Sequence, residues 1–535
     1  MKSYTQSHKT LKAQLFSPIL KNRQQSKNSL SPVPLKSLKS VKRSQSIPRN
    51  SLGTLSMKEK NLSQILPQPK KLNSLDTWKL ANGINLRTKV FIVQGSYPEL
   101  KKSLLDKGWI ENKDPTSSNF DLLWVRTGKF PNNLMDSQVI NHFPNNVEIS
   151  AKWNLCENLR KLKPLFGIDP NTFFPRCFRI FGKEVNDLED HFKVIKAASV
   201  LKQFISNNTG CYEKVATAIV VCRRWLNCSN SVSLRAGSVP FITGSEWKII
   251  SSTSLLDIQV EFKKHFAGRS VALPNEIKSK SIQVLEDIEK HDPQFHMNGM
   301  KDIWIVKPGR KSRGRDIALF DNLEAIKKYT QNPQKWIVQK YIENPMLIDR
   351  KKFDIRQWVL VTNTDPLVVW IYNSCYLRFT VENYDISNID NLFMHLTNNS
   401  ISKNSKKFKV SNIEGCMWHV REFKDYLISN FSEDIWSTKL FPQIKNIVHW
   451  SLRSVGSLGR KNSFEVLGYD FMIDTNFNVW LIEVNSSPAM DYSTPVTTEL
   501  VKEVLHDIVK VILGPEPETG GFQRLETSLQ KISKK

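Results

Sequence analysis

The stretch that decides the fold is residues 464–488, FEVLGYDFMIDTNFNVWLIEVNSSP. It contains two short apolar segments separated by DTNFN, a pattern that predicts two strands joined as a β-hairpin. Side chains alternate between the two faces of a strand, so Glu483 and Asn485 share a face, and Asp470 comes to about the height of Glu483 once the hairpin folds back. Three oxygen-bearing side chains are therefore expected to converge in an otherwise apolar hairpin.

These three side chains are candidate metal ligands. Buried carboxylates are costly unless they are paired or bind a metal ion. Oxygen ligands from Asp470, Glu483 and Asn485, with the rest of the shell open, suit Mg²⁺ that arrives with a nucleotide. The hairpin alone leaves a second interpretation open, in which two acids face solvent beside a turn.

The composition is that of a globular protein with an acidic partner. Of 535 residues, 40% are hydrophobic and 14 are Trp, and the formal net charge is +26. So large a positive charge favours nucleic acid, an anionic membrane or an acidic protein surface as partner. Seven scattered Cys without a CxxC pair favour a reducing compartment over a disulfide framework or a zinc site. The sequence has no run of about 18 apolar residues, so no membrane span is expected, and its N-terminus lacks the pattern of a signal peptide.

The chain is expected to have an α/β (α+β) fold behind a basic tail. Its first 50 residues hold eleven Lys or Arg and no acid, a composition typical of disorder. From Lys89, the segments KVFIVQG, YPELKKSLLDKGWIEN and FDLLWV predict a strand, a helix and a strand. The expected parts are a disordered basic tail (1–85), a small N-terminal α/β domain (86–175), a central domain (176–345), a C-terminal catalytic domain (346–515) and a charged tail (516–535).

A basic, glycine-containing loop follows the strand IWIVKP. Lys307 ends this strand and can reach a phosphate as a point charge. Gly309 and Gly314 allow backbone N–H groups to approach phosphate oxygens. Four cations add charge to the loop: Arg310, Lys311, Arg313 and Arg315. The loop taken alone fits a solvated basic turn equally well. The sequence has no GxxxxGK[ST] segment, which disfavours a P-loop nucleotide site.

Two further strands carry polar residues. The strand KWIVQKYI carries Gln339 and Lys340 near its C-terminal end, and such a strand can line an adenine slot. Taken alone, the segment is interpreted more simply as a core strand. In KKFDIRQWVLV, the residues Lys352, Asp354 and Arg356 alternate and share one face. Two cations beside a carboxylate suit phosphates or an acyl phosphate better than they suit a core.

Three more polar positions complete the candidate site. Arg378 lies among apolar residues in CYLRFTV, and Thr397 and Asn398 lie at the predicted turn HLTNNS. Basic residues for phosphate and an Asp…Glu-x-Asn hairpin for a metal ion all fall in one β-rich half of the chain. That combination favours ATP-dependent chemistry without a P-loop.

In these stretches the chain resembles the tubulin–tyrosine ligase-like family, which has an ATP-grasp fold. The matching segments, in order, are WIVKPGRKSRGRDI, WIVQKYIENP, RKKFDIRQWVLV, YLRFT, HLTNNSI, FEVLGYDFMID and VWLIEVNSSP. Weaker similarity upstream extends the resemblance to about 89–515. The KPGRKSRGRDI, FPRCFR and YPEL segments are most similar to the glycine-ligating (tubulin glycylase) branch. The chain departs from that branch at Asp316, where the branch usually has Gly.

The resemblance implies a protein–glycine ligase that uses ATP and Mg²⁺. It implies that glycine is joined to the γ-carboxylate of glutamates in tubulin C-terminal tails through an acyl phosphate. The implied catalytic residues are Lys352, Arg356 and Arg378, and the implied Mg²⁺ ligands are Asp470, Glu483 and Asn485. The implied nucleotide-binding residues are Lys307 and Lys340 on the phosphates, Gln339, Tyr341 and Ile342 around adenine, and Arg313, Gly314, Lys352, Asp354, Thr397 and Asn398.

The resemblance also implies partners and a location. The expected partners are glycine and tubulin tails in microtubules, with neither nucleic acid nor a membrane, and the chain is expected to act as a monomer. The expected location is the cytoplasm and cytoskeleton, including the ciliary axoneme. Two alternatives stay open: a tubulin glutamate ligase of the same family, and a non-catalytic microtubule- or nucleic-acid-binding protein built on an inactive ligase fold. A charge of +26 fits each of them, because any polyanionic partner predicts it.

Overall fold

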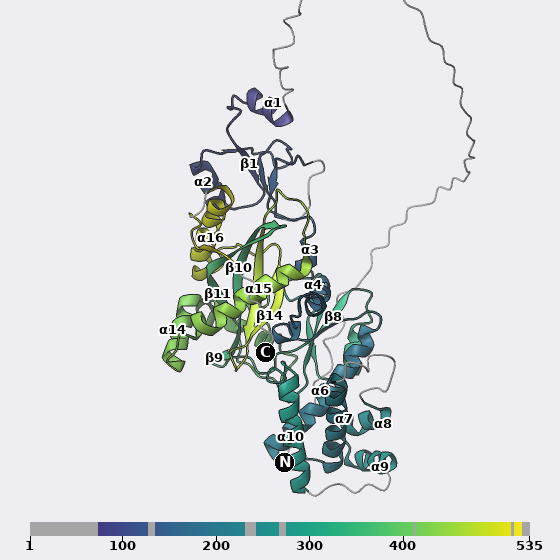
Figure 1. Cartoon of the computed structure of the whole chain (residues 1–535). Coiled ribbons are helices and arrows are strands. Elements are labelled where there is room, and N and C mark those ends of the chain that lie inside the picture. Colours follow the sequence, from purple (N-terminus) through teal and green to yellow (C-terminus); the bar gives the residue numbers. More distant parts are fainter. Residues whose placement is uncertain are drawn as a thin grey trace, which may run out of the picture. The chain divides into compact units, whose positions relative to one another are not determined.

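The computed structural model describes residues 73–126, 134–230, 242–266, 274–410, 413–514 and 518–526 (Figure 1). Most of the predicted basic tail lies outside these ranges. The part that is described is ordered, since α1 spans Ser74–Ala81 and is capped by Asn73, whose side chain accepts from the backbone N–H of Asp76 at 2.8 Å. The predicted disorder is therefore wrong for this helix. Its apolar residues are too few to give a helical period, which is why the sequence did not reveal it.

A small parallel sheet follows α1, with its strands in the order β2-β1-β3-β4. The strands are β1 (Val90–Val93), β2 (Ile110–Glu111), β3 (Leu122–Trp124) and β4 (Val139–Ile140), and α2 (Pro98–Asp106) lies between the first two in the chain. β1 is buried along its whole length, as expected when both faces of a parallel sheet are covered. The strand–helix–strand pattern predicted from Lys89 is confirmed.

A second, antiparallel sheet has the order β5-β8-β6-β7. Its strands are β5 (Cys177–Arg179), β6 (Trp304–Pro308), β7 (Ala318–Phe320) and β8 (Trp336–Lys340). The helices between β4 and β8 in the chain are α3 (Val147–Ser150), α4 (Lys152–Arg160), α5 (Leu162–Phe166), α6 (Glu184–Asn207), α7 (Tyr212–Asn230), α8 (Gly244–Ser251), α9 (Leu255–His265), α10 (Pro274–His291) and α11 (Leu323–Tyr329), of which α4, α6 and α11 contact this sheet. None of the described helices is both long and apolar enough to span a bilayer.

The third sheet is the largest and is antiparallel, with the order β12-β11-β10-β13-β14. Its strands are β10 (Lys351–Thr364), β11 (Leu367–Phe379), β12 (Met417–His419), β13 (Glu465–Ile473) and β14 (Val479–Asn485), with β9 (Leu347–Ile348) and β15 (Phe522–Arg524) paired to β10 and β11. β15 lies within the predicted charged tail, so that prediction is wrong for these residues. Phe522 is the cause, because it is buried against Tyr372 with ring centroids 4.8 Å apart.

The predicted hairpin is confirmed as β13 and β14, and one side chain closes its turn. Asp474 is fully buried and accepts from the backbone N–H groups of Asn476 and Asn478 at 2.9 and 3.0 Å. Its second oxygen accepts from the indole N–H of Trp480 at 2.9 Å. An aspartate that satisfies the turn's own donors fixes the turn and therefore the register of the two strands.

Helices cover the third sheet unevenly, and this leaves room for a site. On one face of β10, Phe353 belongs to a core shared with α14 (Val420–Phe431) and α15 (Phe441–Val455). On the other face, Trp358 and Leu360 pack with α16 (Pro495–Leu513), which contacts α2 (Figure 1). Lys352 and Arg356 lie on this second face too, but nearer the start of the strand, so polar side chains there need not displace core residues.

A buried glutamate joins the N-terminal part of the chain to the third sheet. Glu465, at the start of β13, has no exposed surface. One of its oxygens lies 2.6 Å from His142 Nδ1, and the other accepts from the backbone N–H of Phe143 at 2.7 Å. The side-chain amide of Asn146 donates to both oxygens. Burial raises the pKa of Glu465, and these donors oppose that shift.

Replacing Glu465 with Ala is expected to lower the free energy of unfolding by about 3–5 kcal/mol, because His142 and the Phe143 N–H would lose their buried partner. Chemical denaturation of the full chain measures the change. Glu433→Ala is the matched control, because Glu433 is exposed and its loss should cost less than about 0.5 kcal/mol. Equal unfolding curves for the two variants would contradict the role given to Glu465.

Candidate active site

The three predicted metal ligands converge at the hairpin. The strand register pairs Asp470 with Glu483 and Gly468 with Asn485. The side-chain amide of Asn485 lies 3.2 Å from Glu483 Oε1 and 3.4 Å from Asp470 Oδ2. The three side chains therefore meet at one point of the sheet, and their role as metal ligands stays a prediction.

Two arginines neutralise the buried carboxylates on this face. Arg356 Nε donates to Asp470 Oδ1 at 2.6 Å, and Arg378 Nη2 lies 2.9 Å from Asp470 Oδ2. Arg378 also makes a two-pronged pair with Asp354, with both N–O distances 2.7 Å. Burial raises the pKa of Asp470, and the two guanidinium groups oppose the rise. Arg378 thus bridges Asp354 and Asp470 in a single network.

Glu483 pairs with a lysine that the sequence did not identify. Lys152, at the start of α4, places its ammonium 2.8 Å from Glu483 Oε2 and donates to the carbonyl of Lys311 at 3.1 Å. Burial disfavours the ionised form of Glu483, but Lys152 and then Lys307 outweigh it and hold the pKa of that carboxyl well below its usual range. Lys152 stands far upstream, outside any strand or loop of the β-rich half, so no local pattern marks it.

Lys307 and Gln339 face each other across β6 and β8. Lys307 Nζ donates to Gln339 Oε1 at 2.8 Å, and Gln339 Nε2 donates to the carbonyl of Pro175 at 3.2 Å. Burial lowers the pKa of Lys307 to about 8, and Lys152 contributes to the lowering. An anion bound beside this ammonium would favour its charged form, so the site gains by taking one up.

Lys352, on β10, is a second buried lysine that lines the pocket. Its ammonium donates to the hydroxyl of Tyr341 at 2.9 Å and to the carbonyl of His395 at 2.7 Å. Burial lowers the pKa of Lys352 to about 7. Thr397 donates its hydroxyl proton to Asp354, so the turn at 395–400 is tied to the same network of charges.

The glycine-containing loop packs on α13 (Asn399–Ser402), a short helix that follows α12 (Leu392–His395). Gly314 has φ +70°, and a Cβ there would stand 2.3 Å from Ile401 Cδ1. Ser400 Oγ donates to the carbonyl of Arg313 at 3.1 Å. Together with the bond from Lys152 to the carbonyl of Lys311, these contacts hold the loop over the carboxylates.

Asp316, the departure from the glycine-ligating pattern, adopts a backbone conformation that favours glycine. Its φ is +55°, in the left-handed region. Aspartate enters that region more readily than most residues. Its carboxylate also pairs with the ammonium of Lys311 across the loop. The substitution therefore keeps the loop's path and adds an ion pair to it.

A pocket of about 760 Å³ collects most of the predicted residues. Those that line it are Lys307, Arg313, Gly314, Gln339, Lys340, Tyr341, Ile342, Lys352, Asp354, Thr397, Asn398, Asp470 and Glu483. The other three predicted residues do not line the pocket but contact Asp470, which does: Arg356, Arg378 and Asn485. Apolar side chains such as Ile305, Ile317 and Met472 complete the walls. A pocket that is apolar in part and rich in cations elsewhere suits a nucleotide.

The ammonium of Lys340 does not face this pocket, which corrects the predicted phosphate contact. Gln339 and Lys340 are consecutive in β8, so their side chains leave opposite faces of the strand. Lys340 Nζ lies 2.6 Å from Glu343 Oε1 and donates to the carbonyl of Ile303 at 2.8 Å, and the side chain is completely buried. Lys340 therefore lines the pocket through its main chain.

The hairpin offers two carboxylates and an amide to a metal ion. Across the described ranges, no group of three or more His, Cys, Asp or Glu side chains is placed to hold one. A partial shell of this kind suits a hard cation that brings other oxygen ligands with it, as Mg²⁺ does when it is carried by phosphates. The ionised state of Glu483 also fits a cation partner.

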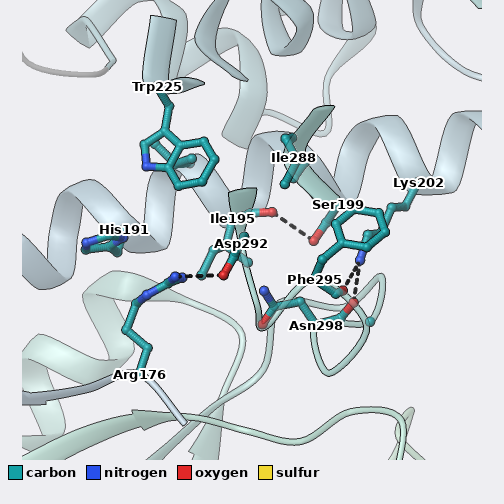
Figure 2. Close-up of a pocket in the computed structure, with 13 residues that line it drawn as sticks. Arg176, His191, Ile195, Ser199, Lys202, Trp225, Ile288, Asp292, Phe295 and Asn298 are labelled. Atoms are coloured by element: carbon teal, nitrogen blue, oxygen red, sulfur yellow. Dashed lines mark hydrogen bonds and ion pairs between the residues drawn. The ribbon is translucent and has the colours of Figure 1, made fainter. Parts of the chain in front are cut away.

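A second pocket, of about 410 Å³, lies between α6, α7 and α10 (Figure 2). Arg176 pairs with Asp292 at 3.1 Å, and Lys202 donates to the carbonyls of Phe295 and Asn298 at 2.8 and 2.5 Å. None of the predicted site residues lines it. Its cations are held by the chain's own acceptors, so these contacts fasten the segment after α10 to the helices.

Comparison with known proteins gives a family match over much of this region. The profile described as the tubulin-tyrosine ligase family matches residues 254–519. Tubulin glycylase 3D of Tetrahymena thermophila is 36% identical over 86% of this chain and 52% of its own length. Protein monoglycylase TTLL8 of Mus musculus is 30% identical over 85% of this chain and 65% of its own length. Tubulin monoglycylase TTLL3 of Homo sapiens is 31% identical over 81% of this chain and 64% of its own length. The chain spans about half the length of the Tetrahymena relatives it matches.

Gly314→Ala is expected to loosen the loop from α13, because the new Cβ must displace Ile401. Gly83→Ala is the matched control, since Gly83 has φ +67° and nothing within 4 Å of an added Cβ. Both substitutions cost about 1–2 kcal/mol of backbone strain. Only Gly314→Ala should raise the rate of trypsin cleavage at the loop's Lys and Arg residues, by roughly tenfold. Equal cleavage of the loop in the two variants would show that the contact with Ile401 does not hold it.

Proposed function

We propose that the chain, whose residues 254–519 match the tubulin-tyrosine ligase family, is a member of that family and an ATP-dependent ligase that joins glycine to the γ-carboxylate of glutamates in tubulin C-terminal tails. Relatives that match most of this chain carry the names tubulin glycylase and protein monoglycylase. The observation that carries the proposal is that Asp470 and Glu483 line one pocket together with buried cations, while Asn485 contacts both carboxylates. Glycine would be added through an acyl phosphate.

We assign Mg²⁺ to the three side chains that converge at the hairpin. Glu483 is held in its ionised form, Asp470 stands beside it in the strand register, and the amide of Asn485 contacts both. When bound with ATP, Mg²⁺ offsets negative charge on the phosphates and supports phosphoryl transfer. Two carboxylates and one amide leave positions for phosphate oxygens, as that task requires.

The nucleotide is assigned to the pocket between the second and third sheets. Lys307 is placed to hold phosphate, since its ammonium is buried, lines the pocket and lies beside Gln339. Lys152 joins it in this role, because it contacts both Glu483 and the loop. The side of the pocket formed by Gln339, Tyr341 and Ile342 is assigned to adenine, with Lys340 contributing main-chain groups. Arg313, Gly314, Lys352, Asp354, Thr397 and Asn398 complete the lining.

The two arginines and Lys352 are assigned to the acyl transfer. The acceptor carboxylate takes the terminal phosphoryl group of ATP to form an acyl phosphate and ADP. The amine of glycine then attacks the acyl carbon, loses a proton and displaces phosphate, which leaves an isopeptide bond. Within the described part of the chain, Arg356 and Arg378 bond to Asp470 and Asp354 through Nε and Nη2. We assign the positive charge of these two guanidinium groups, which lie next to Asp470, to the stabilisation of the developing oxyanion.

The charge of the chain suits the proposed acceptor. Tubulin tails are rich in glutamate, and a chain of net charge +26 would attract them electrostatically. This supports tubulin as the partner and a place on the cytoskeleton. We extend the proposal to cilia and axonemes on the strength of the family resemblance, and to a monomer that needs neither a membrane nor nucleic acid.

In an assay with tubulin, Mg²⁺, ATP and labelled amino acids, the purified chain is expected to incorporate glycine and not glutamate. A glutamate substrate would need a further cation for its side-chain carboxylate, whereas a glycine pocket can be small and neutral. Incorporation of glutamate alone would contradict the proposal and support the related glutamate ligase. Tubulin binding without incorporation of either amino acid would support a non-catalytic binding protein.

Glu483→Gln is expected to lower the rate of incorporation by roughly 100-fold or more, because it removes a charged ligand of the metal that stabilises the reacting phosphates. Binding of tubulin, measured by co-sedimentation with microtubules, should not change. Glu433→Gln, at an exposed position, is the control and should keep full activity. Normal incorporation by Glu483→Gln would show that the metal is held elsewhere.

Lys307 and Lys340 lie on neighbouring strands and are expected to respond differently to replacement by Met. Lys307→Met should weaken ATP binding by roughly tenfold, since it removes a buried cation from the phosphates. Lys340→Met should instead lower the free energy of unfolding by about 3–5 kcal/mol, because Glu343 would be left buried without its partner. Calorimetric titration with ATP and thermal melts separate the two effects. Weaker ATP binding by Lys340→Met, with ATP binding unchanged in Lys307→Met, would support the original prediction that Lys340 contacts the phosphates.

A further inference from the structure

A buried chain of hydrogen bonds leads away from Lys352. Lys352 Nζ donates to the hydroxyl oxygen of Tyr341 at 2.9 Å. That oxygen lies 3.0 Å from Nδ1 of His395, whose Nε2 lies 2.9 Å from the carbonyl of Asn388. The three side chains are almost fully buried, with 4%, 3% and 1% of the surface of Lys352, Tyr341 and His395 exposed. The proposed reaction gives His395 no role.

The protonation states of these groups fix the direction of each bond. Burial raises the pKa of Tyr341 far above its ordinary value, so the hydroxyl keeps its proton. Burial lowers the pKa of His395 to about 4, so the imidazole is neutral at pH 7. The carbonyl of Asn388 can only accept, which places the imidazole proton on Nε2 and makes Nδ1 an acceptor. Tyr341 must then donate to His395, and its lone pairs face Lys352.

The direction of the Tyr341 hydroxyl matters because Lys352 is close to losing its charge. Burial lowers the pKa of Lys352 to about 7, so the neutral amine is well populated near neutral pH. A hydroxyl that presents lone pairs stabilises the ammonium. A hydroxyl turned the other way would donate its proton to the neutral amine and stabilise that form instead.

From this geometry we infer that His395 is a positioning residue, which accepts a hydrogen bond from Tyr341 and thereby keeps Lys352 charged for the nucleotide that the pocket is proposed to bind. The inference rests on the proposed binding of ATP in this pocket. His395 touches no reacting atom. Its carbonyl also accepts from Lys352 at 2.7 Å, but that contact belongs to the main chain and survives any substitution of the side chain.

Other ionisable groups surround this chain. Asp354 and Lys307 act on Lys352 with opposite signs, the first raising and the second lowering its pKa. Tyr384, Glu343 and Asp385 lie around Tyr341 and His395. Tyr384 packs edge-on against the imidazole with ring centroids 5.7 Å apart, and its hydroxyl donates to the carbonyl of Glu343 at 2.8 Å. Because Tyr384 lies this close, the test must show that the imidazole of His395, and not Tyr384, orients the hydroxyl of Tyr341.

The test is calorimetric titration of the full chain with Mg²⁺ and ATP between pH 6 and pH 9. The wild-type affinity should fall as the pH rises through and above about 7, since the charged form of Lys352 is lost. His395→Leu should bind ATP on the order of tenfold more weakly at pH 7, with the fall moved to lower pH by about one unit. His395→Asn should restore both, because its amide oxygen can take the place of Nδ1. Tyr384→Phe should leave the pH profile unchanged.

Each other outcome overturns the inference. A wild-type pH profile for His395→Leu would show that the imidazole does not set the charge of Lys352. Equal weakening by His395→Leu and His395→Asn, with equal loss of thermal stability, would show that His395 only fills space. A shifted profile for Tyr384→Phe would assign the orienting role to Tyr384. Failure of the wild-type chain to bind ATP at any pH would overturn the proposed function as well.

Discussion

Carboxylates cannot be buried on one face of a sheet unless cations are buried with them. This constraint governs the site. Asp354 and Asp470 share Arg378, Asp470 also holds Arg356, and Glu483 holds Lys152. The pairs draw on β10, β11, β13, β14 and α4, so the charge balance is achieved only when distant parts of the chain have come together. The same strand face carries apolar residues where α16 covers it, which confines the charges to the uncovered end.

Two buried lysines of the pocket, Lys307 and Lys352, would be stabilised in their charged form by a bound anion. Burial lowers the pKa of Lys307 to about 8 and that of Lys352 to about 7, so both ammonium groups stand near the point where they lose their charge. Bound phosphates would favour the charged form of both lysines. The loop that carries Gly314 is held by hydrogen bonds from Lys152 and from Ser400 of α13. In the proposed function, these cations hold a nucleotide and the carboxylates hold its metal ion. This division agrees with ATP-dependent ligation in the tubulin-tyrosine ligase family.

The sequence predicted those parts of the site that lie on single strands. The hairpin was predictable because two apolar segments flank the turn sequence DTNFN, in which the structure shows Asp474 accepting from the turn's own N–H groups. The shared face of Lys352 and Arg356 was predictable because side chains alternate between the two faces of a strand. The same rule separates Gln339 from Lys340, and the structure shows the consequence, with Lys340 paired to Glu343 on the other face. Lys152 and His395 were out of reach, because their partners, Glu483 and Tyr341, lie elsewhere in the chain and only the fold brings them together.

The central claim is that Asp470, Glu483 and Asn485 form a cation site that is completed by the nucleotide. Its most direct test replaces Mg²⁺ with Mn²⁺ and follows free Mn²⁺ by electron paramagnetic resonance during titration of the full chain. The account predicts that the chain takes up Mn²⁺ with ATP far more tightly than without it, and that Asp470→Asn removes this gain while Glu433→Gln keeps it. Equal uptake by the wild-type chain and Asp470→Asn in the presence of ATP would contradict the account.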